Sequence, residues 1–297
     1  MAKQDIIRLG AAQFLTGVDI DENAEKIRHY VHEASSLGCR ILLFHEGCLT
    51  GYPDREQIKN IDLSKVSAYE QEFIRMAGET NMSLLLGSTS SRDGSFYNDV
   101  LVIGHKGLLL GRYAKTWRAG EPWYDAGSGP VIFSVSGLEA TVMICHDLRY
   151  PEMVRLPVAA GARIVFIANN ESGLQSEHKL LGYRSMQISR ATENHVFAVM
   201  ANAPSDPKAI GGTNSSHGNS KIIDPMGNVI DEAGWFEERL VWASVDMTQA
   251  TGQPALRSIG RDPGVADVYG TDCEHPDYSS WIKSGLRLVK RLDGTEP

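Results

Sequence analysis

Cysteine is scarce in this chain of 297 residues, and its few cysteines are scattered. Cys39, Cys48, Cys145 and Cys273 form no CxxC pair and no spacing typical of zinc ligands. A disulfide scaffold is therefore not indicated, since a chain this long can bury a core without such staples. We expect free thiols and a reducing, cytoplasmic location.

Long apolar runs and clusters of basic residues are also missing. No apolar stretch approaches the roughly 20 residues that cross a bilayer, and the apolar segment near the N-terminus is too short for a signal peptide. The chain has 29 Lys and Arg against 37 Asp and Glu, a net charge of −8. This excludes the basic footprint of a nucleic-acid binder. We expect no membrane or nucleic-acid partner, and the acidity favours solubility.

Up to about residue 246, short apolar runs alternate with amphipathic stretches, without internal repeats or low-complexity segments. Both strand–helix–strand steps and hairpins occur, which indicates a mixed sheet with helices on one face and a second sheet against the other. The predicted helices cover 21–37, 67–80, 151–160 and 177–193. The predicted strands cover 6–14, 40–45, 82–88, 97–104, 107–113, 131–135, 140–145, 163–168, 196–202, 221–224, 228–231 and 239–246.

The composition changes after residue 246, where the chain becomes polar and rich in glycine and proline. Little periodicity remains before residues 281–291. We therefore divide the chain into a main domain, 1–248, and a C-terminal extension, 249–297. The extension is predicted to be an extended tail that packs on the domain or on a neighbouring subunit; a loose terminus is the alternative.

Three reactive side chains come directly after predicted strands: Glu46, Lys115 and Cys145. Strand ends hold side chains rigidly while leaving them open to a cleft. A thiolate can attack a carbonyl, a carboxylate can carry a proton, and an ammonium can stabilise an oxyanion, so together they suit acyl transfer. Taken singly, each has a structural interpretation: a buried thiol, a loop carboxylate and a solvated lysine. From the positions after strands alone, the catalytic and the structural interpretations are about equally supported.

The sequences around these residues carry more information. FHE at 44–46 with TGY at 50–52, GRYAK at 111–115 and CHDLRYPE at 145–152 resemble the glutamate, lysine and cysteine motifs of the carbon–nitrogen hydrolase (nitrilase) superfamily. The resemblance covers roughly residues 6–246, and three ordered motifs are far more specific than one. It implies an α/β fold, a four-layer α-β-β-α sandwich with two mixed sheets, and a homodimer or higher homo-oligomer paired through helices beside the cleft.

The resemblance also implies the catalytic roles. Cys145 is the nucleophile, Glu46 carries the proton and Lys115 stabilises the oxyanion. A second glutamate is expected shortly after the lysine, and Glu121 is the candidate; an ordinary loop acid is the alternative. The backbone N–H of His146 is a further candidate oxyanion donor. Adjacent residues cannot easily aim at one another, so a Cys145–His146–Asp147 triad is rejected, and Asp147 is expected to brace the turn.

Candidate substrate-binding residues are less distinctive. Tyr52 and Trp117 can wall a pocket, although aromatic residues near a core are usually packing. Asn170 follows a predicted strand and can line the cleft mouth, but asparagine also favours turns. His217 is interpreted as a loop histidine with a structural partner rather than as a partner of the nucleophile.

The resulting hypothesis is hydrolysis of a small amide through a cysteine thioester, with no metal or organic cofactor. Superfamily nitrilases tend to carry Trp-Glu after the cysteine, whereas His146 and Asp147 stand here and favour amide or N-carbamoyl substrates. The alternatives are an N-carbamoyl amino acid or amine hydrolase, a nitrilase, and a non-catalytic binding protein on the same fold. The partner is then a small amide or carbamoyl compound.

Overall fold

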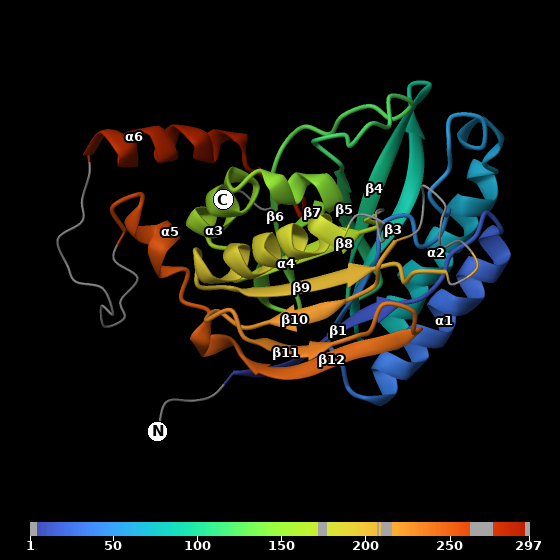
Figure 1. Cartoon of the computed structure of the whole chain (residues 1–297), viewed down its shortest axis with the longest axis horizontal. Helices are drawn as coiled ribbons and strands as arrows, with labels where there is room; N and C mark the ends of the chain where they lie inside the picture. The colour runs from blue at the N-terminus through green and yellow to red at the C-terminus, as the bar shows by residue number, and fades with distance from the viewer. Residues whose placement is uncertain (1–4, 172–176, 207, 209–215, 262–275, 295–297) are drawn as a thin grey trace.

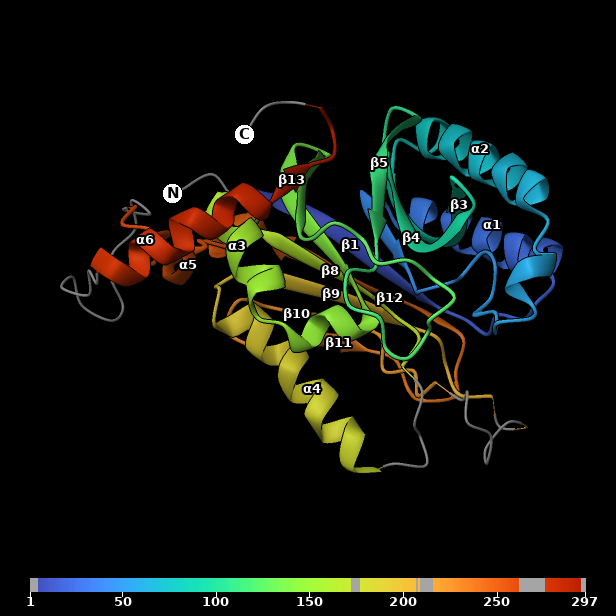
Figure 2. The ribbon, with the colours of Figure 1, turned by 90° about the horizontal axis from the view of Figure 1, so that it is seen from above.

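The computed structural model describes residues 5–171, 177–206, 208, 216–261 and 276–294. Two sheets lie face to face, with α1 and α2 outside one and α3 and α4 outside the other (Figure 1). Figure 2 shows the same layers from above. The helices are α1 (Ile20–Ser36), α2 (Leu63–Glu79), α3 (Glu152–Ala160), α4 (Glu177–Thr192), α5 (Gln253–Arg257) and α6 (Pro276–Gly285). The predicted four-layer α-β-β-α sandwich is confirmed.

Both sheets are mixed. In spatial order, the first contains β12 (Arg239–Asp246), β1 (Ile6–Gln13), β2 (Ile41–Phe44), β3 (Ser83–Arg92), β4 (Ser95–Gly104) and β5 (Leu108–Ala114). The second contains β11 (Val229–Glu232), β10 (Lys221–Ile223), β9 (Phe197–Asn202), β8 (Ile164–Asn169), β7 (Leu138–Ile144), β6 (Val131–Val135) and β13 (Lys290–Arg291).

The apolar strand β2 is buried on both faces, which explains its unbroken hydrophobic sequence. Ile41 and Leu43 belong to the core cluster between the two sheets, whereas Leu42 and Phe44 pack in the cluster beneath α1 and α2. This division follows from the alternation of side chains along a strand. Glu46 comes two residues later, so a rigid, fully packed strand sets its position.

Two elements begin or end four residues from the predicted position, and each difference has a local cause. α2 starts at Leu63 rather than at residue 67 because Asp62 caps it, accepting hydrogen bonds from the N–H groups of Ser64 and Lys65. β3 extends to Arg92 because Asp93 and Gly94, both with positive φ, form a tight turn into β4. Asp-Gly is a strong hairpin signal, which the sequence interpretation overlooked.

The prediction of an extended C-terminal tail is wrong for the described part of that segment. It forms α5 and α6, and β13 then pairs in parallel with β6 at the edge of the second sheet. Arg291 contacts both carboxylate oxygens of Glu139, at 2.7 and 2.9 Å. The segment therefore packs on its own chain, while the boundary at residue 248 stays a prediction. No helix in the described ranges is long and apolar enough to cross a membrane.

Candidate active site

The ends of three strands bring Glu46, Lys115 and Cys145 to one region between the sheets. Glu46 follows β2 and Lys115 follows β5 in the first sheet, whereas Cys145 follows β7 in the second. Their exposed fractions are 1%, 2% and 7%, so all three are buried. A strand end buried between two packed sheets leaves a side chain few alternative positions, which is the preorganisation that catalysis requires.

Lys115 lies between two carboxylates. Its Nζ is 2.8 Å from Oε1 of Glu46 and 2.6 Å from Oε1 of Glu121. Glu121 also accepts hydrogen bonds from the Tyr52 hydroxyl and the Ala119 N–H. Burial alone would lower the pKa of Lys115, but the carboxylates of Glu46 and Glu121 outweigh it and hold this pKa well above its ordinary value. The lysine is therefore a fixed cation.

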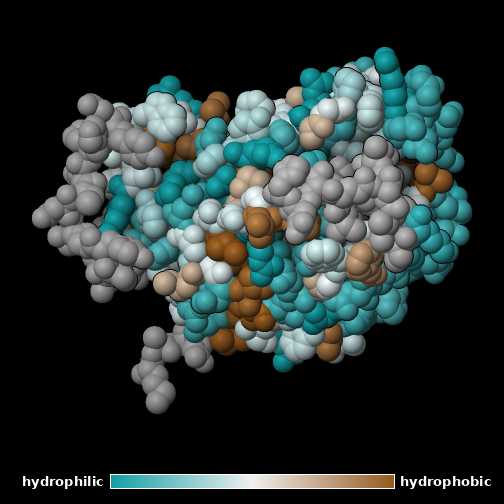
Figure 3. All heavy atoms as spheres, in the orientation of Figure 1, coloured by the Kyte–Doolittle hydropathy of each residue, from teal (hydrophilic) through white to brown (hydrophobic). Residues whose placement is uncertain are grey.

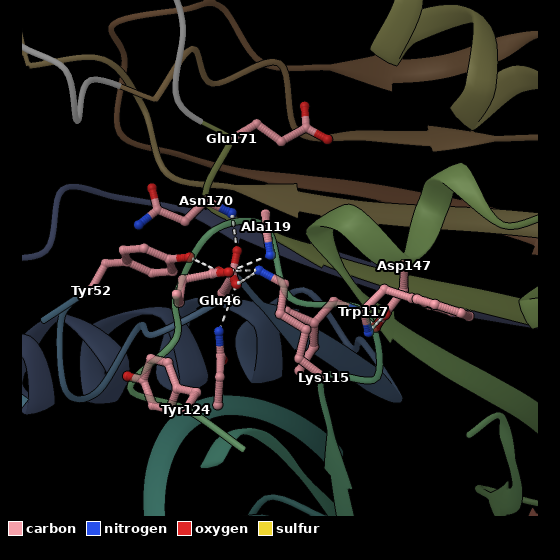
Figure 4. Close-up of polar contacts among 12 residues, drawn as sticks. Glu46, Tyr52, Lys115, Trp117, Ala119, Tyr124, Asp147, Asn170 and Glu171 are labelled. Carbon is pink, nitrogen blue, oxygen red and sulfur yellow. Dashed lines mark hydrogen bonds and ion pairs between the residues drawn. The ribbon is translucent and has the colours of Figure 1, made fainter. Parts of the chain in front are cut away.

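Glu46 accepts two further hydrogen bonds, one at each oxygen (Figure 4). Asn98 donates its side-chain N–H to Oε1 at 2.7 Å, and the backbone N–H of Asn170 donates to Oε2 at 2.9 Å. The predicted residue Asn170 thus contacts the site through its backbone. Asn98 was not predicted; the only sequence signal was a pair of polar residues, Asn98 and Asp99, before the apolar part of a strand. Together these donors aim the carboxylate of Glu46 in one direction.

Cys145 occupies a sharp turn from β7 into a short 3₁₀ helix (Cys145–Arg149). Its φ is +45°, a left-handed conformation that costs a non-glycine residue about 1–3 kcal/mol. The neighbouring Asp147 braces the turn by accepting hydrogen bonds from the N–H groups of Ile144 (3.1 Å) and Trp117 (2.7 Å) and from the hydroxyl of Tyr113 (2.6 Å). Burial and the nearby Glu46 raise the pKa of the Cys145 thiol well above its usual value. The resting sulfur is a neutral thiol that needs a base.

A cleft of about 990 Å³ opens onto Cys145. Of the residues predicted from the sequence, Tyr52, Glu121, His146 and Asn170 also line it. Trp117 is not among the described lining residues; its indole stacks on Tyr150, with ring centroids 4.0 Å apart. A direct substrate contact of Trp117 stays a prediction.

The comparisons with known proteins agree with this geometry. Residues 8–254 match the family described as carbon-nitrogen hydrolase. The chain belongs to this family. A 2-oxoglutaramate amidase of Bacillus subtilis (strain 168) is 28% identical over 235 residues, which are 77% of this chain and 86% of the relative. An (R)-stereoselective amidase of a Pseudomonas species is 26% identical, over 80% of this chain and 84% of the relative.

Solved structures share the fold. An amidase from Nesterenkonia sp. aligns with a TM-score of 0.73 and 23% identity, over 81% of this chain and 90% of that chain. A mutant of the amidase from Nesterenkonia sp. AN1 aligns with a TM-score of 0.74 and 22% identity, over 84% of this chain and 92% of that chain. That mutant carries the acetamide moiety of fluoroacetamide on its active-site cysteine. The family match identifies this protein as a carbon–nitrogen hydrolase.

Beyond the residues around Lys115, this carbon–nitrogen hydrolase has a second buried acidic group at the cleft. Glu171 is 1% exposed and its Oε2 lies 2.9 Å from Nε2 of His217. The partner expected for His217 is therefore present. Cys39 and Cys48 are buried free thiols, and Cys273 lies outside the described residues. Within the described ranges, no group of three or more His, Cys, Asp or Glu side chains is arranged to hold a metal ion.

Proposed function

We propose that this protein hydrolyses the carbon–nitrogen bond of a small amide through a thioester on Cys145. The observation that carries the proposal is the buried Glu46–Lys115–Glu121 arrangement beside a neutral thiol at the floor of a cleft. Relatives named as amidases support an amide substrate. The acetamide adduct on the active-site cysteine of the Nesterenkonia amidase supports a nucleophilic role for the cysteine.

In the first half of the reaction, Glu46 takes the proton from Sγ of Cys145, and the sulfur attacks the amide carbonyl carbon. Negative charge develops on the carbonyl oxygen. Lys115 and the His146 N–H stabilise it, and one such donor typically contributes about 3–4 kcal/mol to lowering the barrier. Glu46 then gives its proton to the nitrogen, the carbon–nitrogen bond breaks and ammonia or an amine leaves. The acyl group remains on Cys145 as a thioester.

In the second half, water attacks the thioester while Glu46 accepts a proton from it. The carbon–sulfur bond then breaks, the acid leaves and the sulfur regains its proton from Glu46. Glu121 has a positioning role in this scheme. By accepting from Lys115 at 2.6 Å, it keeps the ammonium fixed while Glu46 changes its protonation state. All groups named belong to this chain.

The sequence after Cys145 favours an amide over a nitrile, because His146 and Asp147 stand where superfamily nitrilases tend to carry Trp-Glu. Asp147 uses both carboxylate oxygens to brace the turn at Cys145, and His146 lines the cleft. N-carbamoyl compounds present the same carbonyl and leaving nitrogen, so they form the second candidate class. Nitrile hydrolysis instead passes through a thioimidate, whose nitrogen must be protonated at a different place.

The test compares amides, N-carbamoyl compounds and nitriles that share one side chain. We expect ammonia release from the amide or carbamoyl compound to exceed release from the matched nitrile by at least about tenfold, which corresponds to about 1.4 kcal/mol in barrier. Faster nitrile turnover across several matched sets would reverse the substrate assignment while leaving the Cys145 mechanism in place.

We also propose that the chain forms a homo-oligomer through the face that carries α4. Figure 3 shows hydrophobic residues gathered in a strip over the region of α4, β10 and β11. Leu181, Met226 and Ile230 are exposed there, at 72%, 67% and 45%. Light scattering of the protein during size-exclusion chromatography tests this proposal: the mass of two or more chains is expected, and a monomer mass at micromolar concentration contradicts it.

A further inference from the structure

Glu171 is a buried carboxylate of the cleft wall that the proposed reaction does not use. It lies two residues beyond the end of β8 and lines the same cleft as Cys145. Its backbone N–H donates to Oδ1 of Asn202 at 3.0 Å, and its Oε2 lies 2.9 Å from Nε2 of His217. The other oxygen, Oε1, is buried and has no hydrogen-bond partner among the described residues. Among the described residues, this oxygen is therefore an acceptor without a donor, on a residue that lines the cleft.

The surroundings hold Glu171 in place. His217 is 4% exposed and lies beside the ring of Tyr183, with ring centroids 6.2 Å apart. Asn202, which fixes the Glu171 backbone, also accepts from the Ser216 hydroxyl at 2.8 Å. A buried carboxylate fixed by two neighbours keeps its free oxygen in one position, and an unsatisfied buried acceptor is costly unless a ligand completes it.

Three buried carboxylates and one buried lysine lie near Cys145. Glu46 and Glu121 share one cation, Lys115, and Glu171 adds a third buried carboxylate. Lys221 is also buried; its Nζ lies 2.9 Å from Glu232, a carboxylate that it shares with the partly exposed Arg184. Burial raises the pKa of Glu171, as expected for a carboxylate whose charge is incompletely balanced. The free oxygen of this carboxylate would attract a positively charged ligand.

We propose that Oε1 of Glu171 accepts a hydrogen bond from an ammonium group on the acyl part of the substrate. This rests on the proposed amide hydrolysis and names its substrate class: small primary amides whose acyl chain carries a protonated amine. In Figure 4 the Glu171 carboxylate lies apart from the Glu46 cluster and points away from it, so an ammonium bound there would be separate from the group that reacts. A charge-assisted hydrogen bond inside a water-poor cleft is stronger than a neutral one.

The experiment compares kcat/KM for three amides that differ only at the far end of the acyl chain. 4-Aminobutanamide carries an ammonium group, pentanamide replaces it with a methyl group of similar size, and succinamate carries a carboxylate. We expect the wild-type protein to prefer the ammonium over the methyl compound by at least about tenfold. The exposed Arg149 and the partly exposed Lys179 also line the cleft, so a preference for succinamate is the opposite outcome and would overturn the proposal.

Variants assign the preference to a residue. Glu171→Gln keeps the shape and removes the charge, so the ammonium-to-methyl ratio should fall at least about tenfold, whereas His217→Gln should lower it less. Glu22→Gln is the matched control, because Glu22 lines the same cleft but is exposed in the first turn of α1; the ratio should not change. An unchanged ratio in Glu171→Gln would overturn the proposal.

The two proposals fail in different ways. Turnover of the amides without a preference for the ammonium compound overturns only the role of Glu171, and the wild-type protein alone can show this. No turnover of any of the three amides overturns the proposed amide hydrolysis and the role of Glu171 together.

Discussion

Tyr113→Phe removes a hydroxyl that helps to hold Asp147, the residue that braces the turn at Cys145. That hydroxyl donates to Asp147 at 2.6 Å, and both side chains are buried, at 1% and 0% exposure. A hydrogen bond to a charged group contributes about 1.5–3 kcal/mol. Asp147 keeps the N–H donors of Ile144 and Trp117, so the fold should survive with a free energy of unfolding lower by about 2 kcal/mol.

The loss in stability should depend on pH, and its sign follows from Asp147. Burial raises the pKa of Asp147 to about 6 in the folded protein, above the ordinary 3.8 that applies to the unfolded chain, so stability falls as pH rises from about 4 to 6. The Tyr113 hydrogen bond lowers this pKa, and removing it raises the pKa further. The difference between variant and wild type should therefore be largest at pH 8 and smaller at pH 5.

Urea unfolding at pH 5 and pH 8 measures this difference. Tyr124→Phe is the matched control, since Tyr124 is also buried but its hydroxyl contacts a neutral group, Oγ1 of Thr89, at 2.9 Å. The control should lose about 1 kcal/mol at both pH values. If Tyr113→Phe loses the same amount as Tyr124→Phe at both pH values, Asp147 does not carry the charge on which this reasoning depends.

Three further variants test other parts of the structure. Lys115→Arg should lower kcat by about 100-fold or more, because a planar guanidinium cannot replace an ammonium held at 2.8 and 2.6 Å from two carboxylates. Near-normal turnover of this variant would show that Lys115 does not stabilise the oxyanion. Asn98→Asp places a carboxylate where an amide now donates to Glu46 at 2.7 Å. The acid limb of the pH–rate profile should therefore move to higher pH. An acid limb at the same pH as in the wild-type protein would argue against Glu46 as the base. Arg291→Ala should lower the free energy of unfolding by about 1 kcal/mol, because its contacts with Glu139 are lost, while kcat stays unchanged. A large loss of kcat would show that the C-terminal segment influences the cleft.

The reactive residues could be predicted from the sequence, but their proximity in the folded chain could not. Glu46, Lys115 and Cys145 each follow a short apolar run, which local periodicity reveals. Their approach depends on the order of strands within each sheet and on the packing of one sheet against the other. Those are long-range contacts, so the predicted sandwich came from the family resemblance rather than from periodicity.

Residues that support the site were harder to predict. Asn98 contributes because the pairing of β4 with β5 brings it beside Lys115, whose N–H donates to the Asn98 carbonyl at 2.9 Å. Nothing local distinguishes it from a polar residue on a strand surface. Glu171 is similar, since the sequence at Asn170 and Glu171 is equally compatible with the mouth of a cleft and with a turn, and its burial follows from tertiary packing. The C-terminal segment was misjudged because pairing with β6 compensates for its polar composition.

The thioester on Cys145 is the central claim, and mass spectrometry of acid-quenched protein during turnover of a small primary amide tests it most directly. We expect a mass increase equal to the acyl group, confined to the peptide that contains Cys145 and absent from Cys145→Ala. The buried thiols Cys39 and Cys48 are internal controls that should stay unmodified. An acyl group on another residue, or undiminished turnover by folded Cys145→Ala, would contradict a thioester mechanism at Cys145.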